Sequence, residues 1–133
     1  KSLQELSSAL GVTDYVHWIE NVSGKELPGI LSASQCLLQP SRYEGFALPI
    51  LEAMATGVPG VLSNSSCLPE VSAGIWPALP VDDADGFASA MDAMSMDETL
   101  REKTVADGLR HAAGFTWQET ARKTGVFFQD VLA

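Results

Sequence analysis

Short apolar runs alternate with amphipathic stretches along the first 80 residues of the chain. Four of these runs have the length of a strand, at 15–19, 36–39, 58–62 and 75–79, and they are continuous rather than alternating. Continuous runs are typical of parallel strands that helices cover on both faces. After residue 81 the pattern is helical only. The sequence therefore predicts an α/β fold, a Rossmann-like parallel sheet with helices on both faces and a helical C-terminal region.

Helix starts are marked by capping boxes, in which a Ser or Thr is followed three residues later by Glu. The four pairs are Ser2/Glu5, Ser23/Glu26, Ser95/Glu98 and Thr116/Glu119. They predict helices at 3–10, 24–34, 96–112 and 117–131, and the apolar pattern adds helices at 48–56 and 86–95. Helix 117–131 carries a stripe at alternating steps of four and three, which we expect to face the core. The stripe consists of Trp117, Ala121, Thr124, Phe128 and Val131.

The net charge of −9 over 133 residues argues against one class of partner. Nucleic acids are bound by clusters of Lys and Arg, whereas Arg42 is the only cation between Glu26 and Leu100. We therefore expect no nucleic-acid partner, and phosphates would have to be bound by backbone N–H groups or by cations from other sequence. The length corresponds to one domain, 1–133. No apolar run approaches the ~20 residues that a membrane span needs.

The chain begins at Lys1 without a signal-like segment, so we expect a piece of a longer, cytoplasmic protein whose domain is truncated on its N-terminal side. Cys36 and Cys67 show no metal spacing, which favours two reduced thiols. An Asp-x-Asp at Asp83 and Asp85 directly precedes a helical stretch. Asp is common at helix starts, so the pattern favours a cap rather than a metal site, and we expect no metal ligands.

The stretch 43–61 places an ionisable residue, Glu52, on an almost wholly apolar helix, 48–56. At about 100° per residue, the large apolar side chains form one arc, and no charged residue lies on the far side. We therefore expect this helix to be covered on nearly all sides. Because buried carboxylates are rare unless paired, Glu52 needs an explanation. One is a pairing with a buried Arg or a loop N–H, and the other is a ligand.

A loop containing Gly45 joins the predicted strand 36–39 to this helix, and Pro49 suits its first turn. Strand, glycine-containing loop and helix N-terminus present free N–H groups and a positive dipole end to an anion. Glu44 and Glu52 would flank that anion, and a carboxylate accepts hydrogen bonds from a vicinal diol. A nucleotide-sugar, with a pyrophosphate between two diols, fits both features. The alternative for Glu44 is an exposed turn residue.

Residues 40–59 read PSRYEGFALPILEAMATGVP. This stretch resembles the signature of the retaining family 4 glycosyltransferases (glycosyl transferases group 1) of GT-B fold, in which seven residues separate two glutamates. The flanking LGVTDYVHWIENVSGKELPGIL, SNSSCLPEVSAG and FTWQETA are similar to the family as well, so the resemblance spans nearly the whole chain. It implies the C-terminal, donor-binding domain of such an enzyme, here as a fragment.

The resemblance implies a role for each site residue. Glu44 would be the catalytic-site carboxylate that contacts the hydroxyls of the donor sugar, and Glu52 would accept the ribose hydroxyls. Backbone N–H groups would bind the diphosphate, and they belong to Gly45, Phe46, Ala47 and Leu48. Residues 20–23 would lie near the nucleobase. The donor would be a UDP-, GDP- or ADP-sugar, with no cofactor, and transfer would proceed with retention through a short-lived ion pair.

The same resemblance implies partners outside these residues. They are an N-terminal acceptor-binding domain, an Arg/Lys pair that neutralises the diphosphate, and a possible peripheral contact of that domain with the cytoplasmic face of a membrane. Three departures from the pattern stand out: Ala47 replaces the usual glycine, Glu20 stands where glycine is common, and Gly60 interrupts a strand usually filled by valine. A GT-B-related nucleotide-sugar epimerase and a non-catalytic binding or assembly module of the same fold are the alternative functions.

Overall fold

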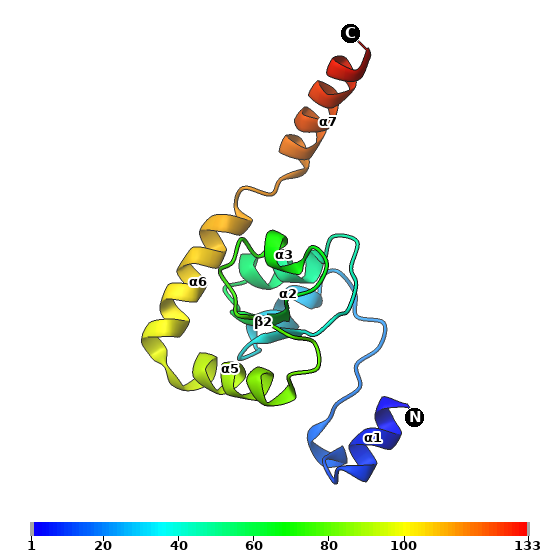
Figure 1. Ribbon diagram of the computed structural model, residues 1–133, viewed down its shortest axis with the longest axis vertical. Coiled ribbons are helices and arrows are strands. Elements are labelled where there is room, and N and C mark those ends of the chain that lie inside the picture. The colour runs from blue at the N-terminus through cyan, green and yellow to red at the C-terminus, as the bar shows by residue number, and fades with distance from the viewer. Residues whose placement is uncertain (1, 133) are drawn as a thin grey trace.

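A three-stranded parallel sheet forms the centre of the protein, which we describe from a computed structural model over residues 2–132. The strands are β1 (Leu37–Gln39), β2 (Gly60–Ser63; labelled in Figure 1) and β3 (Ala78–Leu79). Their order in the sheet is β1-β2-β3. Leu38 is in register with Val61, and Leu62 with Ala78. Three of the four predicted strands are therefore confirmed, although β3 has only two residues at the end of the predicted run 75–79.

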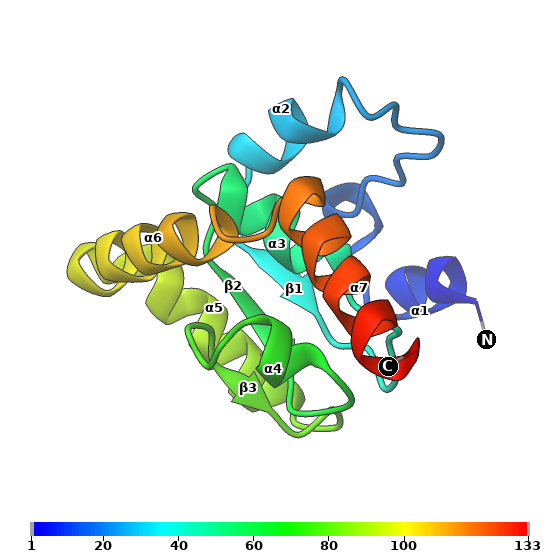
Figure 2. The ribbon, with the colours of Figure 1, turned by 90° about the horizontal axis from the view of Figure 1, so that it is seen from above.

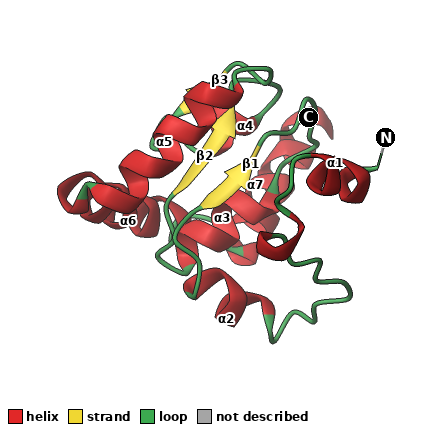
Figure 3. Ribbon diagram, turned by 90° about the horizontal axis from the view of Figure 1, so that it is seen from below, coloured by secondary structure: helices red, strands yellow, loops and turns green. Residues whose placement is uncertain are grey.

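Seven α-helices and one 3₁₀ helix are formed by the described residues. They are α1 (Leu3–Ala9), the 3₁₀ helix η1 (Thr13–Tyr15), α2 (Leu27–Ser32), α3 (Leu48–Ala55), α4 (Leu68–Val71), α5 (Ala84–Met96), α6 (Glu98–Ala112) and α7 (Trp117–Leu132). Helices α2 and α3 lie on one side of the strands and α5 on the other (Figure 2, Figure 3). The predicted parallel sheet with helices on both faces is confirmed, as is the helical C-terminal region.

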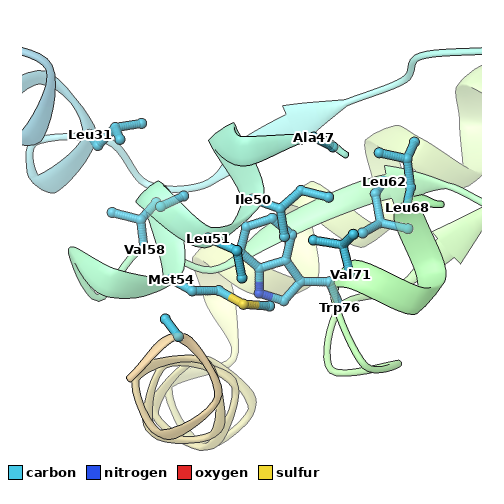
Figure 4. Close-up of a cluster of buried hydrophobic side chains, with 12 residues drawn as sticks. Leu31, Ala47, Ile50, Leu51, Met54, Val58, Leu62, Leu68, Val71 and Trp76 are labelled. Atoms are coloured by element: carbon cyan, nitrogen blue, oxygen red, sulfur yellow. The ribbon is translucent and has the colours of Figure 1, made fainter. Parts of the chain in front are cut away.

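The main core lies between α3 and the sheet and includes the wholly buried side chains of Ile50, Leu62 and Leu68 (Figure 4). The indole of Trp76 is 2% exposed and packs across Gly60. A Cβ on Gly60 would lie 2.4 Å from the Trp76 ring, which is far inside van der Waals contact. Gly60 therefore departs from the family pattern because a large ring occupies the space above this strand.

The first predicted strand, 15–19, is wrong. Thr13–Tyr15 forms the 3₁₀ helix, and the following residues are irregular, with Trp18 and Ile19 exposed. A strand exists only where a neighbour completes its backbone hydrogen bonds. Within residues 2–132 the sheet pairs β1 with β2 and β2 with β3, and no strand pairs with this segment.

Two of the four predicted capping boxes mark their helices correctly. Ser2 and Glu5 exchange both bonds at the start of α1, at 3.2 and 2.9 Å. The hydroxyl of Thr116 accepts a hydrogen bond from the Glu119 N–H at 3.1 Å, directly before α7.

The other two pairs predict the wrong starts. Glu26 bonds the N–H and hydroxyl of Ser23, but α2 begins only at Leu27. Ser95 lies inside α5 and donates to the Met91 carbonyl, while Asp97 caps α6 by accepting from the Leu100 N–H at 2.9 Å. Asp is as good an N-cap as Ser, but the capping-box pattern includes only Ser and Thr. The pattern therefore missed Asp97.

Helix α7 points away from the rest of the protein (Figure 1), so the prediction that its stripe faces the core is wrong. None of its residues is buried, and Trp117, Phe128 and Val131 are 80%, 57% and 64% exposed. Apolar periodicity identifies the face of a helix that needs a partner, but it does not say that the partner lies within the same 133 residues. Among residues 2–132 no helix is both long and apolar enough to cross a membrane.

Candidate functional site

The loop 40–47 joins β1 to α3 and turns sharply at its last residue. Ala47 has φ +65° and ψ +55°, a left-handed conformation, and Leu48 and Pro49 begin the helix directly after it. This explains why glycine is usual at Ala47 in the family pattern, since only glycine adopts this conformation without a steric penalty. Ser2, Asp83 and Asp97 cap α1, α5 and α6, whereas no side chain caps α3.

Four consecutive N–H groups precede or begin α3 without a partner in the described part of the chain. Neither a backbone carbonyl nor a side chain among residues 2–132 accepts from Gly45, Phe46, Ala47 or Leu48. Pro49, the next residue, has no N–H group, so it adds no further unpaired donor to the first turn of α3. Free N–H groups together with the positive end of the helix dipole favour an anion at this point.

Glu44 lies at the start of this turn, half-buried, and its carboxylate is held by two neighbours. Its Oε1 atom accepts hydrogen bonds from Gln39 Nε2 at 2.9 Å and from the Ser41 hydroxyl at 2.8 Å. Gln39 also donates to the Ser41 hydroxyl at 3.0 Å, which closes the set. The sequence analysis singled out Glu44 but neither donor, although Ser41 stands inside the quoted signature.

The backbone of Glu44 is tied to the loop that follows β2. The Glu44 N–H donates to the Ser66 hydroxyl at 3.3 Å, and this hydroxyl donates back to the Glu44 carbonyl at 2.9 Å. The Cys67 thiol lies 3.5 Å from the same carbonyl, and the hydroxyl of the buried Ser63 donates to the Ser41 carbonyl. Ser66 stands in the flanking stretch SNSSCLPEVSAG, but no sequence pattern indicates its contact with Glu44, which is 22 residues away.

Glu52 is exposed, so the prediction that helix 48–56 is covered on nearly all sides is wrong. Ile50 and Met54 are buried, but Leu48 is 51% exposed and lies on the same side as Glu52 and Ala55. The prediction counted Leu48 and Ala55 among the apolar residues that face the core. In a sequence, apolar residues that line an open groove cannot be told from core residues. No buried Arg pairs with Glu52 in the described residues.

A groove of about 620 Å³ runs along this exposed side of α3. One wall carries Phe46, Leu48, Leu51, Glu52 and Ala55, and the other carries Ala112, Phe115, Thr116, Trp117 and Thr120. The rings of Phe46 and Phe115 meet edge to face with centroids 6.3 Å apart, and the rings of His111 and Phe115 meet in the same way at 5.0 Å. The Nε2 atom of His111 lies 2.9 Å from the carbonyl oxygen of Val71, the last residue of α4, so this ring links α6 to α4.

A second, smaller hollow of about 240 Å³ lies between α2 and α3. It is lined by Gly24, Leu27, Pro28, Leu31, Glu52, Ala55 and Thr56. Glu52 therefore stands on the boundary between the groove and this hollow. Residues 20–23, which the resemblance places near a nucleobase, precede Gly24 at the rim, and Asn21 among them has φ +57°.

Charged groups near the loop do not supply a free cation. Arg42 pairs with Asp82 at 2.6 Å, and both side chains are exposed. Asp83 caps α5 by accepting from the Gly86 N–H at 2.9 Å, so the predicted cap is confirmed at one end of the Asp-x-Asp. No cluster of three or more His, Cys, Asp or Glu within residues 2–132 is arranged to bind a metal.

Comparisons with known proteins identify related sequences and a related fold. The sequence model of the glycosyl transferases group 1 family matches residues 1–110. The O-antigen chain mannosyltransferase B of Escherichia coli is 36% identical over 110 residues, which are 83% of this chain and 29% of that protein. The D-inositol 3-phosphate glycosyltransferase of Stackebrandtia nassauensis is 34% identical over 121 residues, 90% of this chain and 27% of that protein.

One solved structure shows the same fold. Sucrose-phosphate synthase from Thermosynechococcus elongatus matches with a TM-score of 0.85 at 24% sequence identity, over 98% of this chain and 33% of that chain. The chain therefore spans about a third or less of the length of each of these proteins.

Proposed function

The chain belongs to the glycosyl transferases group 1 family, and from this premise we propose that it forms the donor-binding part of a retaining glycosyltransferase. The donor is a nucleotide-diphosphate sugar, and the acceptor binds to a separate domain of a longer polypeptide. The observation that carries the proposal is the N-terminus of α3. It is left without a side-chain cap, and one carboxylate precedes it while the other lies one turn inside the helix.

The diphosphate is assigned to the free N–H groups of Gly45, Phe46, Ala47 and Leu48. An anion at this point satisfies donors that the described residues leave open and interacts favourably with the helix dipole. Such an interaction contributes about 1 kcal/mol or less where it is exposed to water. Because Arg42 is engaged by Asp82, further positive charge for the diphosphate has to come from outside the described residues.

The nucleoside is assigned to Glu52 and the hollow between α2 and α3. A ribose diol offers two hydroxyl donors to the two oxygens of the Glu52 carboxylate. This carboxylate is exposed, and no salt bridge engages it in the described residues. The hollow next to it is lined mainly by apolar residues and glycine, which suits the flat face of a nucleobase. Residues 20–23 would then contact the edge of the base.

The donor sugar is assigned to Glu44. In a retaining transfer, the bond between the anomeric carbon and the diphosphate oxygen breaks, and its electron pair leaves with the diphosphate. The acceptor hydroxyl forms the new bond on the same face of the sugar, and its proton passes to the departing phosphate oxygen. Glu44 would bind the sugar hydroxyls and stabilise the transient positive charge rather than act as the nucleophile.

The test uses the longer polypeptide that carries this chain, with a panel of UDP-, GDP- and ADP-sugars. Glu52→Ala is expected to weaken binding of the donor about tenfold or more, because the ribose loses a charged acceptor. Glu44→Ala is expected to lower kcat with the fold intact. Glu102→Ala is the matched control, since Glu102 is an exposed glutamate on α6, away from the groove.

Three outcomes would contradict the proposal. Unchanged kinetics in both Glu44→Ala and Glu52→Ala would contradict the assignment of these two residues to the donor site. Conversion of the nucleotide-sugar to a 2-epimer without transfer would identify the protein as an epimerase of the same fold. A longer polypeptide that binds no nucleotide-sugar would favour a binding or assembly module instead.

A further inference from the structure

Glu44 is held at three points before any ligand arrives, by Gln39, Ser41 and Ser66. We propose that these three residues are positioning residues, which fix the Glu44 carboxylate so that one oxygen, Oε2, is presented to a hydroxyl of the donor sugar. This inference rests on the proposed function and assigns roles to side chains that do not themselves belong to the signature's pair of glutamates.

The hydrogen-bond donors around Oε1 form a consistent set. The Gln39 amide has two hydrogens, and it directs one to the Ser41 hydroxyl at 3.0 Å and the other to Glu44 Oε1 at 2.9 Å. The single Ser41 hydrogen then points to the same Oε1 atom at 2.8 Å. The two hydrogens of Gln39 Nε2 and the single hydrogen of the Ser41 hydroxyl are enough for these three contacts, and Glu44 Oε1 accepts two of them. Within residues 2–132, Oε2 receives no hydrogen bond from either neighbour.

The residues that hold Glu44 are themselves fixed by the sheet and by the loop after β2. Gln39 is the last residue of β1 and is paired with Leu62 of β2. Ser66 fixes the Glu44 peptide through both its N–H and its carbonyl, and Ser63 holds the Ser41 carbonyl from the end of β2. The position of the Glu44 side chain is therefore set both by its own loop and by the loop after β2.

This arrangement reduces the entropic cost of ordering the Glu44 side chain when the sugar binds. A free glutamate side chain loses rotamer freedom when it is ordered, and a misplaced carboxylate binds a developing charge poorly. Hydrogen bonds to a charged group are stronger than those between neutral groups. Because they are already made in the free protein, the ordering does not have to accompany the binding of the sugar.

The first experiment separates the sugar from the nucleotide. In the longer polypeptide, affinities are measured for UDP and GDP and for UDP-glucose and GDP-mannose, together with kcat for transfer. Gln39→Leu removes both amide donors and is expected to lower kcat about tenfold to a hundredfold. It should leave the affinity for UDP or GDP within twofold, because the nucleotide is assigned to Glu52.

Ser66→Ala is expected to lower kcat in the same way, by about fivefold to tenfold. Ser65→Ala is the matched control in the same loop, because the Ser65 hydroxyl makes none of the bonds that hold Glu44. Ser41→Thr, which keeps the hydroxyl, should recover most of the activity that Ser41→Ala loses. A merely structural role would lower stability in all of these variants without distinguishing nucleotide from nucleotide-sugar.

The second experiment does not depend on activity. In the 133-residue chain, the Gln39 side-chain NH₂ signals in an ¹⁵N spectrum are expected to move in Glu44→Ala and to stay in place in Glu102→Ala. The Glu44 amide hydrogen should exchange faster in Ser66→Ala than in Ser65→Ala. Unchanged signals and exchange rates would overturn the hydrogen-bonded arrangement itself.

The outcomes of the two experiments separate the two hypotheses. If the wild-type polypeptide binds none of the four probes and transfers no sugar, the proposed function fails, and the role of the three residues falls with it. If the wild type is active while Gln39→Leu and Ser66→Ala keep full kcat, only the positioning role is overturned.

Discussion

Ala47 holds a left-handed conformation at the residue where the loop turns into α3. The conformation costs a residue with a Cβ roughly 1–2 kcal/mol, and a glycine avoids this cost while losing a buried methyl group. Ala47→Gly is therefore expected to leave the free energy of unfolding unchanged or to raise it by up to about 1 kcal/mol. Denaturant unfolding of the purified chain measures this difference.

The control for this prediction is Ala106→Gly. Ala106 is exposed in the interior of α6, where glycine lowers stability by about 1 kcal/mol relative to alanine. If Ala47→Gly destabilises the chain as much as Ala106→Gly, the left-handed residue is not strained.

Gly60 lies beneath the indole of Trp76, and any Cβ there would meet the ring. Gly60→Ala is expected to lower the free energy of unfolding by about 1–3 kcal/mol, as overpacking of a core does. Gly29→Ala is the comparison, because a Cβ at Gly29 of α2 meets no atom within 4 Å. That variant should be neutral or slightly stabilising, and equal losses in both variants would rule out the steric cause.

Single residues of the site were predictable where their chemistry is local. The apolar pattern around Glu52 predicts a helix at 48–56, and α3 ends one residue earlier, at Ala55. The exposure of Glu52 was not predictable, because Leu48 and Ala55 line a groove with side chains that would suit a core. Ser66 was not predictable either, since only folding brings it to Glu44.

Among the elements, α7 has an apolar stripe on which no other described element packs. A helix of 16 residues without tertiary packing is marginal in water. In the 133-residue chain we expect the backbone amides of α7 to exchange hydrogen much faster than those of α3 and α6, which pack on each other. Hydrogen exchange followed by mass spectrometry measures this, and equal protection of α6 and α7 would contradict it.

The error on α7 and the error on residues 15–19 have the same physical origin. An apolar period shows that a segment has a face to bury, and an apolar run shows that it can join a sheet. Both signals are silent about the neighbour that does the burying or completes the hydrogen bonds. The central elements β1, α3, β2 and β3 were predicted correctly because their neighbours lie within the described residues.

At the scale of the whole molecule, the site is open on one side, and the one cation of its loop, Arg42, is paired in the described structure. The net charge is −9, and Arg42 is engaged by Asp82. We therefore expect the isolated chain to bind nucleoside diphosphates weakly and to transfer no sugar. Titration calorimetry with UDP and GDP and a transfer assay with the purified chain test this. Sugar transfer by these 133 residues alone would contradict it.

The bonds from Ser63 and Ser66 to the loop 40–47 also bear on how the site could be moved to another protein. A graft of residues 40–59 onto a foreign scaffold would carry both glutamates and the turn at Ala47, but it would leave the Glu44 peptide without its anchor. The smallest portable unit is the crossover from β1 through α3 to β2 together with the loop up to the start of α4, because this second loop braces the loop 40–47.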